Sequence, residues 1–185
     1  MLDPEDEPKL WEALAVPPAF ALPLARLALL TGMRENELLT LEKTEAISGA
    51  ASSSSSIRSG GGTRAEPGGL PVCEEALKLL AELCARTGGR LFTDDDVGPV
   101  TLSRSSNLFR RRAAAVGLAG MGFHFLRRTF GTRLGEAGVG PYAIARLMGH
   151  SNIKTSMIYV HPPVESLRRA AEAAASRRAG HPADT

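Results

Sequence analysis

Short helical segments separated by glycine and proline dominate this sequence and limit it to a mainly helical fold. Residues 73–87 show the pattern well, since Leu77, Leu80 and Leu83 recur at helical spacing on one apolar stripe. Only residues 48–69 interrupt it with a tract of serine and glycine, and the apolar residues 70–72 after that tract give a weak strand signal. The expected class is mainly α (α+β) and multihelical, with a small antiparallel β-sheet near residues 43–72.

The chain has 185 residues, which fits one domain, residues 1–185, that is long enough to bury a core. Residues 19–30 are almost wholly apolar and are predicted to form a buried helix, with Pro23 in its first turn. Residues 94–99 are predicted to form a loop, because they hold aspartates, glycine and proline. The expected helices lie at residues 5–15, 19–30, 34–42, 73–87, 101–116, 124–137, 141–148, 154–159 and 163–178.

Charge divides the chain into two unequal halves. Residues 1–100 carry 9 basic and 16 acidic side chains, a net charge of −7, whereas residues 101–185 carry 13 and 4, a net charge of +9. A basic surplus of this size favours a polyanionic partner, most simply nucleic acid. The alternative is that the arginines only solvate the outer faces of helices.

The cysteines and the start of the chain favour a reducing compartment. Cys73 and Cys84 lie eleven residues apart in one expected helix, and hence roughly 16 Å apart, too far for a disulfide. The first residues are acidic and lack the basic-then-apolar order of a signal peptide. The uncharged stretch at residues 13–25 is broken by prolines and is too short to span a membrane. We expect a cytoplasmic protein.

Five polar side chains are suited to act together on a phosphodiester: Arg34, His124, Arg127, His150 and Tyr159. Arginine binds phosphate oxygens in a bidentate manner, histidine donates or shuttles a proton, and a tyrosine hydroxyl can act as a nucleophile. His124 and Arg127, three residues apart on an expected helix, project from one face. Each residue alone has a structural interpretation: a surface pair, a packed tyrosine, or an arginine that caps a helix. Their joint order favours a site.

The stretches around these residues resemble three boxes of the tyrosine recombinases, the phage-integrase-type site-specific recombinases. The first-arginine box is similar to TGMRENELLTL at residues 31–41, and the His-x-x-Arg box to HFLRRTFGTRLGEAGV at residues 124–139. The Gly-His box with its tyrosine is similar to RLMGHSNIKTSMIYVHP at residues 146–162. The resemblance covers residues 24–162, and it implies an integrase-type catalytic domain and a site-specific DNA recombinase or integrase.

The resemblance implies a role for each of the five residues. Arg34 and Arg127 would grip the scissile phosphate, and His150 would hydrogen-bond to it. His124 would assist transfer of the tyrosine proton or hold the phosphate. Tyr159 would attack the phosphorus, which gives a 3′-phosphotyrosine link and a free 5′-hydroxyl. No metal or cofactor is expected, because the covalent link conserves the energy of the cleaved bond.

The sequence departs from the family at a β-hairpin that normally carries a catalytic lysine, the general acid for the leaving 5′-oxygen. The corresponding residues 57–72 contain no lysine, and Gly60–Gly62 fall where it belongs. Three explanations stay open. The hairpin is shifted, and Lys43 or an arginine such as Arg58 or Arg64 takes the place of the lysine. Alternatively, the enzyme is catalytically impaired, or the Ser/Gly tract is an altered loop. The lysines of the chain are Lys9, Lys43, Lys78 and Lys154.

Double-stranded DNA is the expected partner, with a tetramer on the DNA and no contact with a membrane. The helix at residues 163–178 is expected either to dock on a neighbouring protomer as an exchange element or to pack on its own domain. Because the chain begins almost at the catalytic domain, we expect the usual N-terminal core-binding domain to be absent, from a minimal protein or a fragment. The basic residues expected to contact DNA are Arg110, Arg111, Arg112, Arg128 and Lys154.

Two other functions stay open beside the recombinase. One is a DNA-binding remnant of the family that is catalytically impaired, and the other is a type IB topoisomerase-like enzyme. Tyr142, the other tyrosine of the chain, is predicted to serve in packing, and His161 is given a structural role.

Overall fold

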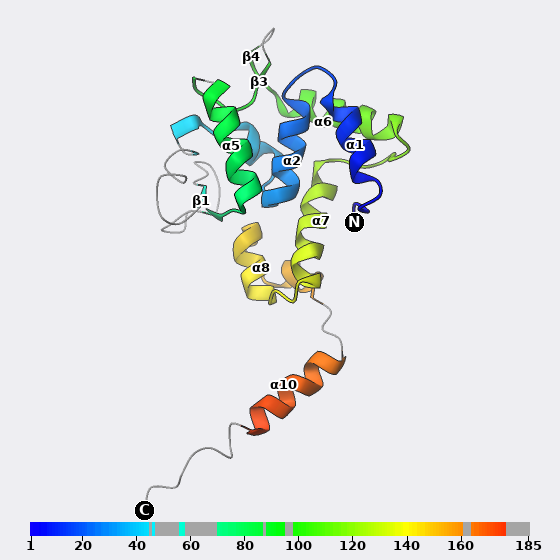
Figure 1. Cartoon of the computed structure of the whole chain (residues 1–185), viewed down its shortest axis with the longest axis vertical. Coiled ribbons are helices and arrows are strands. Elements are labelled where there is room, and N and C mark those ends of the chain that lie inside the picture. The colour runs from blue at the N-terminus through cyan, green and yellow to red at the C-terminus, as the bar shows by residue number, and fades with distance from the viewer. Residues whose placement is uncertain are drawn as a thin grey trace, which may run out of the picture.

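The structure, a computed structural model, confirms a mainly helical chain with a small antiparallel sheet (Figure 1). It describes residues 1–44, 46, 56–57, 70–86, 88–94, 98–160 and 164–176. The helices are α1 (Glu7–Ala15), α2 (Ala21–Thr31), α3 (Glu35–Leu39), α5 (Glu74–Arg86), α6 (Leu102–Ala115), α7 (Phe123–Glu136), α8 (Pro141–Met148), α9 (Lys154–Met157) and α10 (Val164–Ser176). Two antiparallel pairs of strands are formed by β1 (Ser56–Ile57) with β2 (Leu70–Pro71) and by β3 (Thr93–Asp94) with β4 (Gly98–Pro99).

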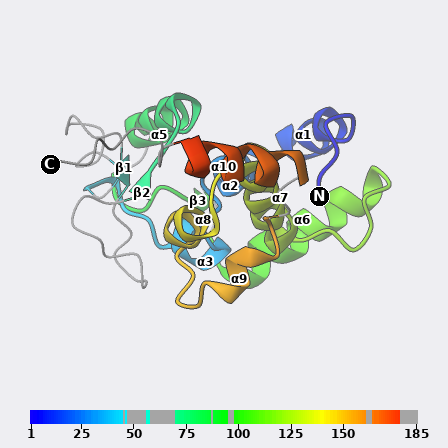
Figure 2. The ribbon, with the colours of Figure 1, turned by 90° about the horizontal axis from the view of Figure 1, so that it is seen from below.

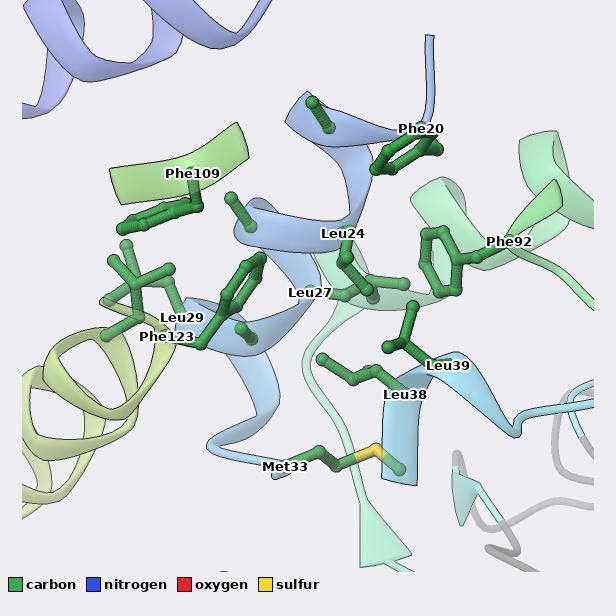
Figure 3. Close-up of a cluster of buried hydrophobic side chains, with 14 of the residues drawn as sticks. Phe20, Leu24, Leu27, Leu29, Met33, Leu38, Leu39, Phe92, Phe109 and Phe123 are labelled. Atoms are coloured by element: carbon green, nitrogen blue, oxygen red, sulfur yellow. The ribbon is translucent and has the colours of Figure 1, made fainter. Parts of the chain in front are cut away.

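Helix α2 is the centre of the fold, because seven of its eleven residues are buried. It packs against α1, α5 and α7 (Figure 1). Leu24 and Leu27 lie in the cluster of buried side chains that also holds Phe92, Phe109 and Phe123 (Figure 3). The rings of Phe109 and Phe123 have centroids 4.6 Å apart and are tilted by 41°, within the range of favourable aromatic pairs. The nearly uniform apolar sequence of α2 thus reflects burial on several sides.

Two sequence predictions of local structure are wrong, and backbone pairing explains both. The helix predicted for residues 34–42 ends at Leu39, since residues 41–43 run beside residues 89–91 through backbone hydrogen bonds of 2.9 and 3.0 Å. Of the residues predicted to form a loop at 94–99, Asp94 and Gly98–Pro99 belong to the paired strands β3 and β4, and residues 95–97 lie outside the described residues. Strands of two residues show no alternation of polar and apolar side chains, so the sequence pattern gave no signal for them.

Both cysteines are free thiols, as the sequence predicts. Cys73 is exposed just before α5, and Cys84 is buried within α5. Burial raises the pKa of the Cys84 thiol, while the nearby charge of Lys43 partly offsets that rise. The thiol inside the core therefore stays neutral and packs as an apolar group.

Helix α10 lies apart from the other described helices (Figure 1). Its Val164 and Leu167 are 82% and 55% exposed. Apolar side chains of α10 are therefore not covered by the part of the chain that the structure describes. Within that same part, no helix is both long and apolar enough to cross a membrane.

The central place of α2 can be tested by truncating one of its core side chains. Leu24→Ala should lower the free energy of unfolding by about 2–5 kcal/mol, because it leaves a cavity at a fully buried position. Leu102→Ala, at a half-exposed position of α6, should cost less than about 1 kcal/mol. Urea denaturation followed by circular dichroism measures both values, and equal losses would contradict the central role of α2.

Candidate active site

Helix α7 carries four residues whose spacing places them on one face: His124, Arg127, Gly131 and Gly135. His124 lies in the first turn and is exposed, whereas Arg127, one turn further, is only 4% exposed. Helix α8 packs against α7, and α9 packs against α8 (Figure 2). This face of α7 is the base of the candidate site.

The guanidinium of Arg127 joins the carboxyl ends of two helices. Its Nη1 donates to the carbonyl oxygen of Gly32, which follows α2, and its Nη2 donates to the carbonyl oxygen of Met148, the last residue of α8, each at 2.5 Å. Carbonyl groups at this end carry the negative pole of the helix dipole and favour a nearby cation. Gly32 suits its place because its φ is +61° and because a Cβ there would come within 2.2 Å of the Phe130 ring. Arg127 therefore fixes α2, α7 and α8 relative to one another.

Arg34 connects the start of α3 to the same end of α8. Its backbone N–H donates to Glu37 Oε2 at 2.9 Å, and its Nη1 donates to Glu37 Oε1 at 2.8 Å. Its Nη2 lies 3.4 Å from the carbonyl oxygen of Gly149, which closes α8. The pairing with Glu37 confirms the structural interpretation of Arg34, yet its side chain is still 47% exposed. Arg34 is thus both held in place and open to a ligand.

His150 follows directly after this junction and lies beside Tyr159. Its backbone N–H donates to Ala145 at 2.9 Å, and its Nδ1 lies 2.7 Å from the hydroxyl oxygen of Ser156. The rings of His150 and Tyr159 have centroids 6.4 Å apart and are nearly parallel, with 13° between their planes. Helix α8 and the turn around α9 therefore bring the predicted histidine and the predicted nucleophile together.

Two glycines of α7 give Tyr159 its place. A Cβ on Gly131 would lie 2.9 Å from Cζ of the Tyr159 ring, and a Cβ on Gly135 would lie 1.8 Å from the Tyr159 carbonyl oxygen. Real Cβ atoms do not approach so closely, so the segment can lie here only against glycine. We call Gly131 and Gly135 the glycine face of α7. This face lies on the same side of α7 as His124 and Arg127.

Sequence reasoning did not identify the glycine face or Ser156 as part of the site. A signal for the glycines was present, since two glycines four residues apart inside a helix cost about 1 kcal/mol each and call for a packing reason. Ser156 carries no such signal in the sequence. Its side chain becomes informative only once it is seen buried against His150.

The basic residues predicted to contact DNA fall into two groups. The exposed ones are Arg110, Arg111, Arg128 and Lys154. Arg112 is half-buried and donates to the carbonyl oxygens of Ala13 at 3.3 Å and Pro17 at 2.9 Å. In this structure Arg112 therefore ties α6 to the end of α1.

Other sequence predictions concern residues around the site. Gly60–Gly62, Arg58, Arg64 and His161 lie outside the described residues. Tyr142 is 68% exposed, so its predicted packing role is wrong. Within the described residues, no group of three or more His, Cys, Asp and Glu side chains is placed to hold a metal ion.

Curated relatives of the chain are tyrosine recombinases. XerC of Roseiflexus sp. (strain RS-1) is 29% identical over 160 residues, which cover 77% of this chain and 50% of the relative. XerA of Thermococcus kodakarensis is 51% identical over 51 residues, which cover 28% of this chain and 18% of the relative. The chain thus spans half the length, or less, of these relatives.

Solved structures share the fold. The Tn1549 transposon integrase, determined in complex with circular intermediate DNA, has a TM-score of 0.72 and 22% identity, with 91% of this chain and 63% of that chain covered. The crystal structure of XerA recombinase has a TM-score of 0.66 and 24% identity, with 91% and 61% covered. These likenesses confirm the predicted integrase-type catalytic fold. A model of the phage integrase family matches residues 1–165, and the chain therefore belongs to that family.

Proposed function

We propose that this chain cleaves and rejoins duplex DNA at specific sites through a 3′-phosphotyrosine intermediate. The observation that carries the proposal is the convergence of four predicted residues at the carboxyl end of α8. Arg127 binds Met148, Arg34 reaches Gly149, and His150 follows with its ring beside that of Tyr159. A phosphate bound here would meet cations, a hydrogen-bond donor and a nucleophile together.

The proposed reaction is a transesterification at phosphorus. The Tyr159 hydroxyl oxygen attacks the scissile phosphate and loses its proton, while the bond to the 5′-oxygen breaks and that oxygen gains a proton. His124, exposed at the start of α7, assists transfer of the tyrosine proton or holds the phosphate. Attack on the phosphotyrosine by a 5′-hydroxyl reverses the step and joins the strands.

The two arginines divide the binding of the phosphate. Arg34 is half-exposed and can contact a non-bridging oxygen directly, held by Glu37 in the required orientation. Arg127 is buried and adds its positive charge from inside the protein, where a low dielectric strengthens its effect. Exposed Arg110, Arg111 and Arg128 suit contacts with DNA phosphates that position the duplex.

The partners follow from the same proposal. The relatives whose structures hold DNA include the Tn1549 integrase and the XerH recombinase bound to its difH substrate, and we assign double-stranded DNA to this chain. We further propose that α10 acts as the exchange element between protomers in a tetramer on DNA, since its apolar Val164 and Leu167 are exposed. Action on DNA in this way accords with a location in the cytoplasm.

The nucleophile can be tested with a nicked duplex that traps the covalent intermediate. The wild type should form a protein–DNA adduct that resists denaturation, and Tyr159→Phe should form none, because it lacks the attacking oxygen. Tyr142→Phe is the matched control and should react as the wild type does. An adduct that survives in Tyr159→Phe and is lost in Tyr142→Phe would refute the assignment.

The glycine face predicts a positional effect on the same reaction. Gly135→Ala should slow adduct formation by roughly 100-fold, since its Cβ would displace the Tyr159 backbone by an ångström or more. Duplex binding in a gel-shift titration should be retained. Gly89→Ala, where a new Cβ meets no atom within 4 Å, should leave the rate unchanged. A wild-type rate in Gly135→Ala would count against the glycine face.

The absent hairpin lysine makes a catalytically impaired DNA-binding remnant the second candidate function. Placing lysine in the Gly60–Gly62 stretch, as Gly61→Lys, should accelerate adduct formation by about 10²-fold or more if only the general acid is missing. Single-turnover rates on the nicked duplex measure the gain, with Gly61→Arg as the control that adds charge without a ready proton donor. DNA binding without an adduct in either protein would favour the remnant.

A further inference from the structure

We propose that Ser156 is a positioning residue that sets the tautomer of His150, so that the imidazole presents Nε2–H as a donor toward the phosphate. The idea deepens the proposed function and rests on it for its chemical meaning. Its structural part stands on the contacts of Ser156 alone.

The contact between the two side chains is short, and the serine in it is buried. The Ser156 hydroxyl oxygen lies 2.7 Å from Nδ1 of His150, and Ser156 is 0% exposed. Ser156 belongs to α9, where its backbone N–H donates to the carbonyl oxygen of Ile153 at 2.8 Å. The buried hydroxyl is therefore held at a set position beside Nδ1.

An inventory of protons indicates the direction of this hydrogen bond. If Nδ1–H donated to the serine, the buried hydroxyl proton would need an acceptor of its own. Among the described residues, the Ser156 hydroxyl makes no other hydrogen bond. Leaving a buried donor unsatisfied is costly, so the serine donates and Nδ1 accepts. In neutral imidazole the other nitrogen, Nε2, then carries the proton.

Ser156 also connects the histidine to the nucleophile. Its side chain binds His150, while its carbonyl oxygen accepts the backbone N–H of Tyr159 at 3.1 Å. The nearly parallel rings of His150 and Tyr159 are thus anchored by the same residue. A substitution that removes only the hydroxyl breaks the hydrogen bond to His150 and leaves the backbone hydrogen bond to Tyr159. The two functions of Ser156 can therefore be separated by mutation.

The tautomer can be read directly by ¹⁵N NMR of the imidazole nitrogens on the full chain, free of DNA. At about pH 8, where a histidine of ordinary pKa is neutral, His150 in the wild type should show unprotonated Nδ1 and protonated Nε2. His150→Gln identifies its signals among the four histidines. Ser156→Ala should give a mixture of tautomers, and Thr155→Ala, which removes an exposed hydroxyl from the same helix, should not.

The same variants are then compared on the nicked duplex. Ser156→Ala should slow adduct formation about tenfold, the loss expected for one hydrogen bond that orients a reacting group, while Thr155→Ala keeps the wild-type rate. A wild type with protonated Nδ1 overturns the proposal. So does a slower Ser156→Ala whose tautomer is unchanged, because serine would then act only through packing.

Failure of the proposed function gives a different result. If the wild type forms no adduct on any duplex and the NMR signals still follow Ser156 as expected, the recombinase assignment fails and the tautomer assignment stands. If the wild type forms the adduct and the tautomer does not depend on Ser156, the tautomer assignment fails and the recombinase assignment stands.

Discussion

The buried guanidinium of Arg127 holds together the elements from which the site is made. A cation removed from water is expensive to bury unless it is paired and hydrogen-bonded, and here the carbonyl groups that end α2 and α8 supply both the acceptors and the negative ends of two helix dipoles. Because both acceptors belong to the main chain, no substitution of a side chain on α2 or α8 removes them. The residue proposed to stabilise charge in the reaction is therefore also a structural residue of the domain.

The other site residues are arranged around the same helix end. Arg34 reaches the residue after the one that Arg127 binds, and His150 comes directly after that. The closing turn of α8 thus contacts the start of α3 and helix α7, which are distant in the sequence, as well as α9, which follows it within a few residues. The basic half of the chain holds four of the five proposed site residues, all except Arg34, which fits the proposed binding of an anionic backbone at this point.

Much of the fold and of the candidate site could be predicted from the sequence, and the features that could not be predicted all depend on tertiary contacts. Pro141 and Gly149 mark the limits of α8, whose observed bounds match the predicted ones, and the five residues of the proposed site follow from residue type and order. The end of α3 and the β3–β4 hairpin were missed because they depend on pairing between distant or very short segments. The burial of Arg127, the glycine face and the contact of Ser156 with His150 were missed because only tertiary packing creates them.

The glycine face makes room for Tyr159 because its two residues have no side chains, and the same two residues lower the stability of α7. Two glycines inside a helix forgo about 2 kcal/mol of helical stability relative to alanine, and both lie in the second half of α7. The first half is held by the buried arginine; in the second half Arg133 pairs with Glu7 of α1, and the Tyr159 segment packs over the two glycines. The stretch beneath Tyr159 therefore has the lowest intrinsic helix propensity in α7, and part of its stability depends on the tyrosine segment staying in place.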